Sequence, residues 1–289
     1  MKVRSRGELV VGIGDDCAIF RPRGAREDLL FTTDLLLDGV HFRTETHRAE
    51  NVGHKALARG LSDIAAMGGE PRFCLVSLSV PPSTPDSWVD GFYRGLLRLA
   101  GRYSTALAGG DLARSPMLGC DIVVCGAVPR GLALRRDGAR AGDGIYVSGR
   151  LGGSALGLAS GTGAAWKRHL RPEPRIALGC FLRKKLRATA AMDLSDGLSL
   201  DLRRMCLASG LAAEIEEPPP FRGATVEQAL HGGEDYELLF TLAPHARPPR
   251  SFERIQLTRV GTMRKGRAGE VRLHGRRLDP LGYDHFRKS

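Results

Sequence analysis

The sequence lacks the features of membrane, secreted and disulfide-rich proteins. It contains no run of about 18 apolar residues, the length that a membrane-spanning helix needs. The opening stretch MKVRSRGELVVGIGDD has no apolar block of signal-peptide length before its acidic residues. Six cysteines are scattered without a C-x-x-C pair, so neither a disulfide framework nor a zinc ribbon is indicated. We therefore expect a soluble, cytoplasmic protein with reduced cysteines and no membrane partner.

The short motifs of several common enzyme classes are also missing. The chain has no Walker A sequence, no H-E-x-x-H, no G-x-S-x-G and no G-x-G-x-x-G. These absences disfavour a P-loop ATPase, a zincin, an α/β-hydrolase and a classical dinucleotide-binding protein.

Aromatic residues are scarce, at 6% of the chain, and no recognised nucleic-acid-binding motif occurs. The net charge of +11 nevertheless favours an anionic partner. Most of the excess lies in residues 138–289, which carry 25 Lys and Arg against 16 Asp and Glu, spread in ones and twos. A basic nucleic-acid-binding protein is thus an alternative. We expect no nucleic-acid partner, because the excess positive charge has another explanation: a basic protein surface around an acidic site would attract anionic substrates such as nucleotides.

What the chain does contain is an alternation of apolar runs and helical patterns, with 42% hydrophobic residues to fill a core. The pattern predicts strands at 28–33, 73–80, 119–128, 145–148 and 236–241, and helices at 51–67, 87–102 and 155–160. We predict a mixed α/β (α+β) fold of two domains, residues 1–137 and 138–289, joined near residues 135–142.

Several aspartates share one context, at the end of an apolar run and next to glycine or a helix start. They are Asp15, Asp16, Asp34, Asp111, Asp193 and Asp196, while Asp63 lies on an apolar face of a helical pattern. Singly, each could be a turn former or a helix cap. Carboxylates at strand ends, however, converge on one edge of a sheet and repel one another unless cations neutralise them.

Oxygen ligands of this kind suit Mg²⁺, which prefers carboxylates, hydroxyls, water and phosphates. Thr32 and Thr33 lie beside Asp34, and Ser195 lies between two of the aspartates. From the residues alone we infer Mg²⁺-dependent phosphoryl transfer, in which metals bridge phosphate oxygens and the protein positions the reactants.

Nine motifs occur in the order found in one enzyme family. They are Gly12-Ile-Gly-Asp-Asp-Cys-Ala18, Thr32-Thr-Asp34 with Asp38-Gly-Val-His-Phe42, Lys55-Ala-Leu-Ala58 with Leu61-Ser-Asp-Ile-Ala-Ala-Met-Gly68, Gly109-Gly-Asp111, Gly142-Asp143, His169-Leu-Arg-Pro172, Asp193-Leu-Ser-Asp-Gly-Leu198, Gly232-Gly-Glu-Asp-Tyr-Glu-Leu238 and Gly282-Tyr-Asp-His-Phe286. The chain resembles the thiamine-monophosphate kinases across nearly its whole length. These enzymes transfer the γ-phosphoryl group of ATP to thiamine monophosphate, giving thiamine diphosphate.

The resemblance implies an N-terminal α/β domain that contributes to a β-barrel in a homodimer, and a C-terminal α/β domain. ATP and several Mg²⁺ ions would lie in a cleft between them. Family members usually carry a longer segment before the stretch that Gly12 to Ala18 matches, where this chain has Met1 to Arg6.

The resemblance also implies roles for individual residues. The implied metal ligands are Asp16, Thr32, Thr33, Asp34, Asp63, Asp111, Asp193 and Asp196, of which Asp34, Asp111 and Asp193 would carry catalysis. The implied nucleotide contacts are Gly110, Asp111, Arg136 and Ser195, and the implied thiamine monophosphate contacts are His41, Glu234 and Tyr283. An arginine fork suits phosphate oxygens, a carboxylate suits a cationic ligand, and a tyrosine can stack on a positively charged ring.

Two other enzyme classes remain alternatives. One is another ATP-using member of the same superfamily. The Gly232 to Glu237 motif disfavours aminoimidazole ribonucleotide synthetase. Selenophosphate synthetase is disfavoured because this chain has no Cys or Lys in a glycine-rich N-terminal segment. The other is a metal-dependent phosphohydrolase that uses the same carboxylates on water. Two features are given structural interpretations: Gly152-Gly153-Ser154 as a tight turn, and Asp201 as a residue serving its own helix.

Overall fold

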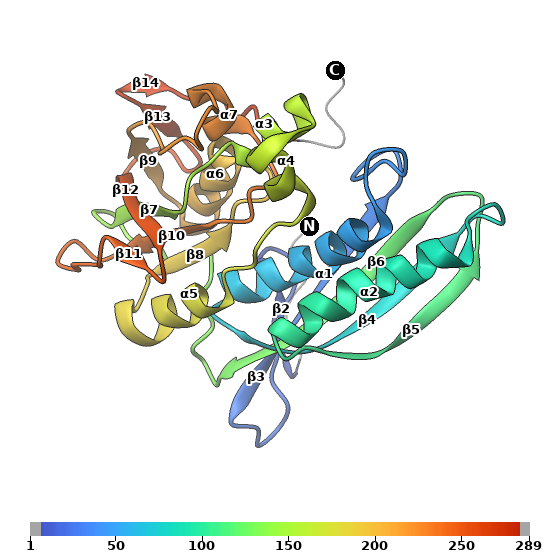
Figure 1. Cartoon of the computed structure of the whole chain (residues 1–289). Helices are drawn as coiled ribbons and strands as arrows, with labels where there is room; N and C mark the ends of the chain where they lie inside the picture. The colour runs from blue at the N-terminus through green and yellow to red at the C-terminus, as the bar shows by residue number, and fades with distance from the viewer. Residues whose placement is uncertain (1–6, 284–289) are drawn as a thin grey trace.

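The computed structural model describes residues 7–283 and contains two β-sheets with helices packed between and beside them (Figure 1). The prediction of a mixed α/β fold is confirmed. Met1 to Arg6 and the last three residues of the Gly282 to Phe286 motif lie outside the described residues. Within residues 7–283, none of the helices combines the length and the apolar character needed to cross a membrane.

The first sheet has six strands in the order β1-β2-β3-β6-β4-β5. Its strands are β1 (Leu9–Val11), β2 (Ala18–Phe20), β3 (Glu27–Leu37), β4 (Glu70–Val80), β5 (Ala106–Arg114) and β6 (Gly119–Pro129). All pairs are antiparallel except β4 with β5, whose parallel connection runs through a helix. Strand β5 is therefore an edge, and two strands separate it from β3.

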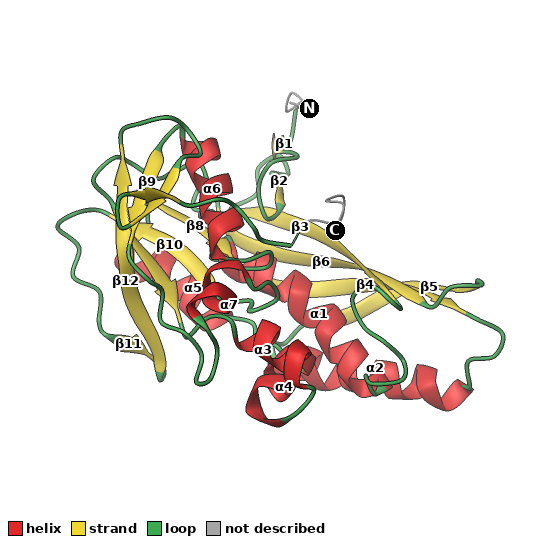
Figure 2. Ribbon diagram, turned by 90° about the horizontal axis from the view of Figure 1, so that it is seen from above, coloured by secondary structure: helices red, strands yellow, loops and turns green. Residues whose placement is uncertain are grey.

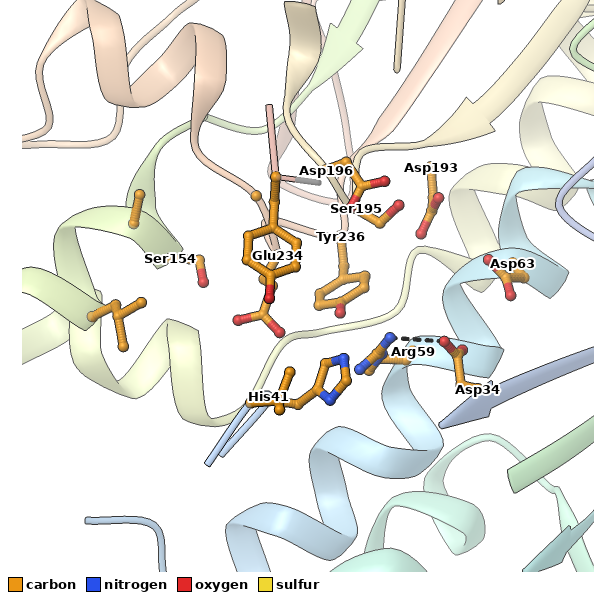
Figure 3. A pocket seen from close by; sticks show the side chains of 15 residues that line it. Asp34, His41, Arg59, Asp63, Ser154, Asp193, Ser195, Asp196, Glu234 and Tyr236 are labelled. Atoms are coloured by element: carbon orange, nitrogen blue, oxygen red, sulfur yellow. Dashed lines mark hydrogen bonds and ion pairs between the residues drawn. The ribbon is translucent and has the colours of Figure 1, made fainter. Parts of the chain in front are cut away.

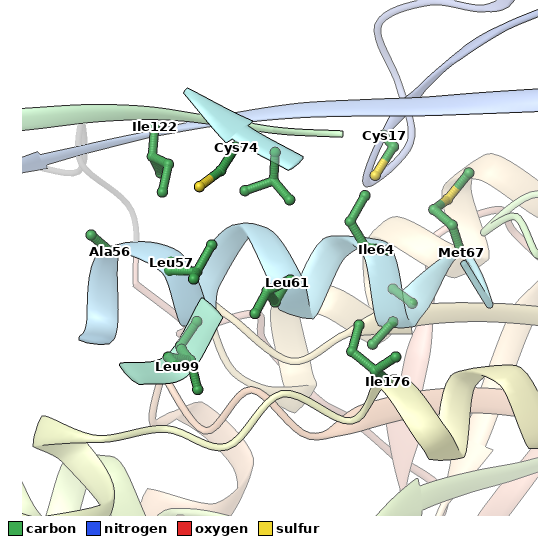
Figure 4. Close-up of a cluster of buried hydrophobic side chains, with 14 of the residues drawn as sticks. Cys17, Ala56, Leu57, Leu61, Ile64, Met67, Cys74, Leu99, Ile122 and Ile176 are labelled. Carbon is green, nitrogen blue, oxygen red and sulfur yellow. The ribbon is translucent and has the colours of Figure 1, made fainter. Parts of the chain in front are cut away.

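Helices α1 (Ala49–Ala66) and α2 (Asp86–Arg102) lie side by side across one face of this sheet (Figure 1). Figure 4 shows Leu57, Leu61 and Ile64 of α1 between side chains of the sheet and those of α2 and the later helix α5. The opposite face carries no described helix (Figure 2), and Leu35 on it is 52% exposed. Helix α1 is thus a central element with neighbours on several sides.

The contact between α1 and α2 depends on two glycines. A Cβ added at Gly53 would lie 1.9 Å from the carbonyl oxygen of Phe92, and one added at Gly95 would lie 1.9 Å from that of Glu50. Real side chains cannot occupy such positions, so the two backbones approach more closely than any other residue would permit.

The second sheet has eight strands and follows the first in the chain. Its main path is β14-β13-β9-β12-β7-β10-β8, and β11 pairs with β12. The strands are β7 (Gly144–Ser148), β8 (Ala190–Asp193), β9 (Ala212–Ile215), β10 (Leu238–Leu242), β11 (Ser251–Phe252), β12 (Ile255–Arg264), β13 (Val271–Leu273) and β14 (Arg276–Arg277). The helices are α3 (Gly153–Ser160), α4 (Gly163–Leu170), α5 (Ile176–Phe181), the π-helix η1 (Leu182–Leu186), α6 (Leu198–Ser209) and α7 (Val226–His231).

Two hydrophobic cores support these sheets, and the larger one is not confined to either half of the chain. It includes Ile176, Leu238 and Phe240 together with the residues around α1, and α5 packs directly on α1. The smaller core contains only residues between Ala139 and Val271. A domain boundary at residue 137 therefore stays a prediction, although it falls between the last strand of the first sheet and the first strand of the second.

Three details of the predicted strands are wrong. Thr32 to Asp34 lie inside β3, because pairing with β6 continues without interruption to Leu37. Gly109 to Asp111 likewise lie inside β5, paired with β4. Strand β10 begins at Leu238 and not at Tyr236, because Glu234 and Tyr236 adopt positive φ angles of 62° and 50° that interrupt an extended chain.

Candidate active site

A cavity of about 380 Å³ lies where β3 and α1 meet loops of the second sheet. Its lining residues are Asp34, Val40, His41, Arg59, Asp63, Ser154, Ala155, Leu158, Asp193, Ser195, Asp196, Gly233, Glu234, Tyr236 and Tyr283. Figure 3 shows Asp34, Asp63 and Asp193 at one end of this group and Glu234, Ser154 and His41 toward the other. The cavity thus has an acidic end and a second, mixed end.

At the acidic end, three aspartates from distant parts of the chain come together. Asp16 lies just before β2, Asp63 lies on α1, and Asp193 ends β8. Each offers a carboxylate oxygen, and the three oxygens all lie within 4.8 Å of one another. The structure thus brings together three of the aspartates that the sequence analysis named as metal ligands.

Burial raises the pKa of all three carboxyl groups, and repulsion from neighbouring aspartates, Asp34 among them, raises the pKa of Asp63 and Asp193 further. The pKa of Asp193 rises to about 6 even though Ser62 Oγ donates a hydrogen bond of 2.8 Å to it. Thr32 Oγ1 donates to Asp63 at 2.5 Å, while Asp16 Oδ2 is buried with no partner among the described residues. A buried carboxylate oxygen left unpaired is costly, so this cluster favours a bound cation.

The donor set fits Mg²⁺. All the groups at the cluster are oxygens, from carboxylates and nearby hydroxyls, and no described cysteine or histidine belongs to it. Zn²⁺ would favour nitrogen or sulfur ligands, which the cluster does not offer.

Arg136 lies beside this cluster. Its Nη2 donates to Asp16 Oδ1 at 2.6 Å, and its backbone N–H faces the carboxylate of Asp15 at 3.3 Å. Asp15 also accepts from the backbone N–H of Asp16 at 3.0 Å. Asp15 therefore holds the loop and the arginine in place beside the cluster.

Two further aspartates of the cavity are paired with arginines. Asp34 Oδ1 accepts from Arg59 Nη2 at 2.9 Å, and Asp196 Oδ2 accepts from Arg204 Nη1 at 2.5 Å. Asp201, fully buried, accepts from the backbone N–H of Asp196 at 3.0 Å. Asp201 therefore fixes the loop before its helix, which agrees with the structural role predicted for it.

At the other end of the cavity, Glu234 is the central charge. Its Oε2 accepts from Lys55 Nζ at 2.8 Å, and His169 Nδ1 lies 3.4 Å from the same oxygen. Burial alone would raise the pKa of Glu234, but Lys55 and His169 outweigh it and hold the pKa below its usual value. His41 and the half-exposed Tyr283 line the cavity nearby.

Lys55 and Arg59 are two charged residues at the cavity to which the sequence analysis assigned no role. Lys55 is only 1% exposed, and both side chains lie on α1 at a spacing of four residues, which places them on one face with Asp63. The sequence did hold a signal for their role, because Lys55 and Arg59 fall on an otherwise apolar face of the helical pattern. Two cations on such a face need buried acidic partners.

A second buried charge network supports the wall of the cavity. The carboxylate of Asp235 accepts from the backbone N–H groups of Gly152 and Ser154 at 2.5 and 3.1 Å. The chain's own carboxylate thus fills the N-terminus of α3, and Gly152, with φ of 80°, forms the tight turn that was predicted. Glu237 is completely buried and accepts from Arg168 at 2.9 Å and from Arg175 at 2.8 Å.

The structure does not bring every predicted residue to this cavity. Thr33 Oγ1 donates to Asp121 at 2.7 Å, on the side of β3 away from α1, because successive side chains of a strand alternate between faces. Gly110 and Asp111 lie exposed on the edge strand β5. Within one chain, these three residues are therefore separate from the cluster of Asp16, Asp63 and Asp193.

Comparisons with known proteins agree with this architecture. Residues 14–128 match the family described as AIR synthase related protein, N-terminal domain. The chain is 39% identical to the thiamine-monophosphate kinase of Rhodopirellula baltica, over 84% of this chain and 79% of that protein. It is 38% identical to the Escherichia coli K12 enzyme of the same name, over 98% of this chain and 94% of that protein.

A solved structure described as AaThiL complexed with AMPPCP and TMP superimposes with a TM-score of 0.86 at 35% identity, covering 95% of this chain and 92% of that one. The match over residues 14–128 thus relates the first sheet, with Asp16 and Asp63 of the acidic cluster, to the AIR synthase-related class of proteins. Within that class, the chain belongs to the thiamine-monophosphate kinase family.

Proposed function

We propose that this protein phosphorylates thiamine monophosphate at the expense of ATP, giving thiamine diphosphate and ADP, a step in thiamine diphosphate biosynthesis. The observation that carries the proposal is that one cavity holds both a cluster of buried aspartates, at one end, and Glu234 with Tyr283, at the other. One end suits metal-bound phosphates and the other suits a cationic aromatic ring.

We propose Mg²⁺ as the metal, held by Asp16, Asp63 and Asp193, with Thr32, Asp34 and Asp196 completing the set around it. Bound Mg²⁺ would neutralise negative charge on the phosphate oxygens of ATP and on the phosphoryl group that is transferred. The protein carboxylates need this neutralisation as well, because their own repulsion opposes ionisation in the buried cluster.

The chain's residues then act by positioning and by charge, without a covalent intermediate. A terminal phosphate oxygen of thiamine monophosphate is already anionic at neutral pH, so no general base has to remove a proton before in-line attack on the γ-phosphorus. We assign catalysis to Asp34, Asp111 and Asp193, whose carboxylates would hold the cations that neutralise the phosphate charge. Arg136 and Ser195 contact the nucleotide, and Gly110 allows its close approach.

Glu234, His41 and Tyr283 are proposed to bind the thiamine end of the acceptor. Glu234 carries a negative charge and forms an ion pair with Lys55, with 2.8 Å between Glu234 Oε2 and Lys55 Nζ. Tyr283 offers an aromatic ring at the cavity. Both Glu234 and Tyr236 keep positive φ angles, a strained backbone that is typical of functional sites.

We also propose a homodimer built on the first sheet, with a β-barrel formed by the two copies. The support is the open face of this sheet, where Leu35 and Leu75 are exposed, and the unpaired edge strand β5, where Leu112 is 60% exposed. An apolar face and an unpaired edge are features that proteins normally cover. Thr33, Gly110 and Asp111 would then act at the interface between copies.

The direct test is to mix the purified protein with ATP, Mg²⁺ and thiamine monophosphate and to separate the products by chromatography. Formation of thiamine diphosphate supports the proposal. Loss of ATP without thiamine diphosphate, whether or not the acceptor is present, would instead identify the phosphohydrolase. A salt-sensitive mobility shift with DNA, in a protein that does not turn over ATP, would identify the nucleic-acid-binding alternative.

A further inference from the structure

Arg59 occupies the middle of the cavity, between its two ends. Figure 3 shows its guanidinium between His41 and Asp34, with Glu234 on one side and Asp63 on the other. The side chain is 14% exposed, and it reaches this position from α1, one helical turn before Asp63. Arg59 is therefore a cation placed inside a largely acidic cavity.

The hydrogen-bonding capacity of Arg59 is only partly used. Nη2 donates to Asp34 Oδ1 at 2.9 Å, whereas Nε and Nη1 are buried without a partner among the described residues. Buried N–H groups of a guanidinium are costly to leave unpaired, and a planar fork suits two oxygens of one phosphate. The unpaired donors thus indicate that the occupied cavity holds an anion here.

The charge of Arg59 is permanent. Burial alone would lower its pKa, but Tyr236 and the carboxylates of Asp34 and Glu234 raise it above the usual value. Lys55, the other cation of this helical face, is already committed to Glu234 at 2.8 Å. Arg59 is therefore the cation of this face that retains free donors for a ligand.

We propose that Arg59 binds the phosphate group of thiamine monophosphate and, through its contact with Asp34, holds that phosphate beside the metal cluster. The inference rests on the proposed function, because it assumes that the thiamine end of the acceptor lies at Glu234 and Tyr283. In that orientation the phosphate of the acceptor points toward Asp63 and Asp193, and Arg59 lies between the Glu234 end and the acidic end of the cavity. Without Arg59, the phosphate would face carboxylates of its own sign.

The test compares two ligands that differ only in the phosphate. Binding of thiamine and of thiamine monophosphate is measured by calorimetry on the Mg²⁺-loaded protein with a non-hydrolysable ATP analogue, for the wild type, Arg59→Met and Arg59→Lys. Arg59→Met should lose about 10- to 100-fold in affinity for thiamine monophosphate and little for thiamine. Arg59→Lys should recover part of the loss, because it keeps the charge without the fork. The matched control Arg98→Met, on the exposed side of α2, should change neither affinity.

The outcomes separate this inference from the proposed function. If Arg59→Met weakens both ligands equally, Arg59 only supports the cavity, and the inference is wrong. If it weakens neither ligand, the phosphate lies elsewhere, and the inference is also wrong. If wild-type protein neither binds thiamine monophosphate nor forms thiamine diphosphate, the proposed function itself fails, a result that is visible before any variant is compared.

Discussion

The carboxyl group of Asp193 shows how burial and neighbours change the chemistry of one residue. Its pKa in the folded protein is about 6, against 3.8 for an ordinary aspartate. Between these two values the unfolded chain has released the proton while the folded chain still holds it. The contribution of this carboxyl group to the stability of the metal-free protein therefore falls as pH rises from about 4 to about 6, because its ionisation inside the cluster costs free energy.

A bound divalent cation should remove this penalty, so its effect should depend on pH. We expect Mg²⁺ to raise the melting temperature more at about pH 7.5 than at about pH 5, because protons compete with the metal for the same carboxylates at low pH. Thermal unfolding of the protein with and without Mg²⁺ at the two pH values measures the effect. Equal stabilisation at both would argue against a metal site at Asp16, Asp63 and Asp193.

Among the elements, helix α1 connects the packing of the first sheet to the site. Its apolar side chains Leu57, Leu61 and Ile64 are fully buried, while Lys55, Arg59 and Asp63 enter the cavity or its wall at four-residue intervals. The helix is held against α2 by the glycine contacts described above. A shift of α1 would therefore displace cations and metal ligands together.

The glycine contact predicts a specific loss of stability. Gly95→Ala should lower the free energy of unfolding by about 1–3 kcal/mol, because its Cβ would collide with the backbone of Glu50 and force the helices apart. The matched control is Gly101→Ala in the same helix, where an added Cβ meets nothing and the substitution should be neutral or slightly stabilising. Chemical denaturation of both variants measures the difference, and equal effects would contradict the close-contact explanation.

At the scale of the whole molecule, the open face and free edge of the first sheet are the features left without a partner in one chain. We expect Leu112→Lys, a charge placed on the edge strand β5, to shift the protein from dimer to monomer in sedimentation velocity. Leu97→Lys replaces a leucine of similar exposure on helix α2 instead of on the edge strand and should leave the dimer intact. A wild-type protein that sediments as a monomer would exclude the proposed assembly.

The position of Asp111 leads to a second prediction about the assembly. Asp34→Asn and Asp111→Asn should each abolish turnover at any Mg²⁺ concentration if both residues serve the site. Since β6 and β4 separate their strands in one chain, Asp111 should serve the site of the partner copy. Co-expression of the two variants would then restore about a quarter of the wild-type rate, because half of the dimers are mixed and each holds one unaltered site. No recovery would show that Asp34 and Asp111 of one site come from the same chain, which would contradict the prediction.

Local sequence patterns predicted several of the regular elements and indicated the type of chemistry. The helical spacing around Leu57 and Leu61 predicted α1 nearly to its ends, and the aspartates at 16, 63, 193 and 196, with their neighbouring hydroxyls, predicted an oxygen-only metal site. Both inferences rest on periodicity and ligand preference, which are properties of residue type and short-range spacing, and the metal itself stays a prediction.

Only the tertiary structure decided which of these residues meet. It placed Thr32 and Thr33 on opposite faces of β3, kept Asp111 on a distant edge, and paired Lys55 with Glu234 across 179 positions of the chain. It also brought Arg59 to Asp34, a contact for which the sequence holds no motif. The physical reason is that strand order, pleat and the packing of α1 between two layers arise from long-range burial, which no local pattern encodes.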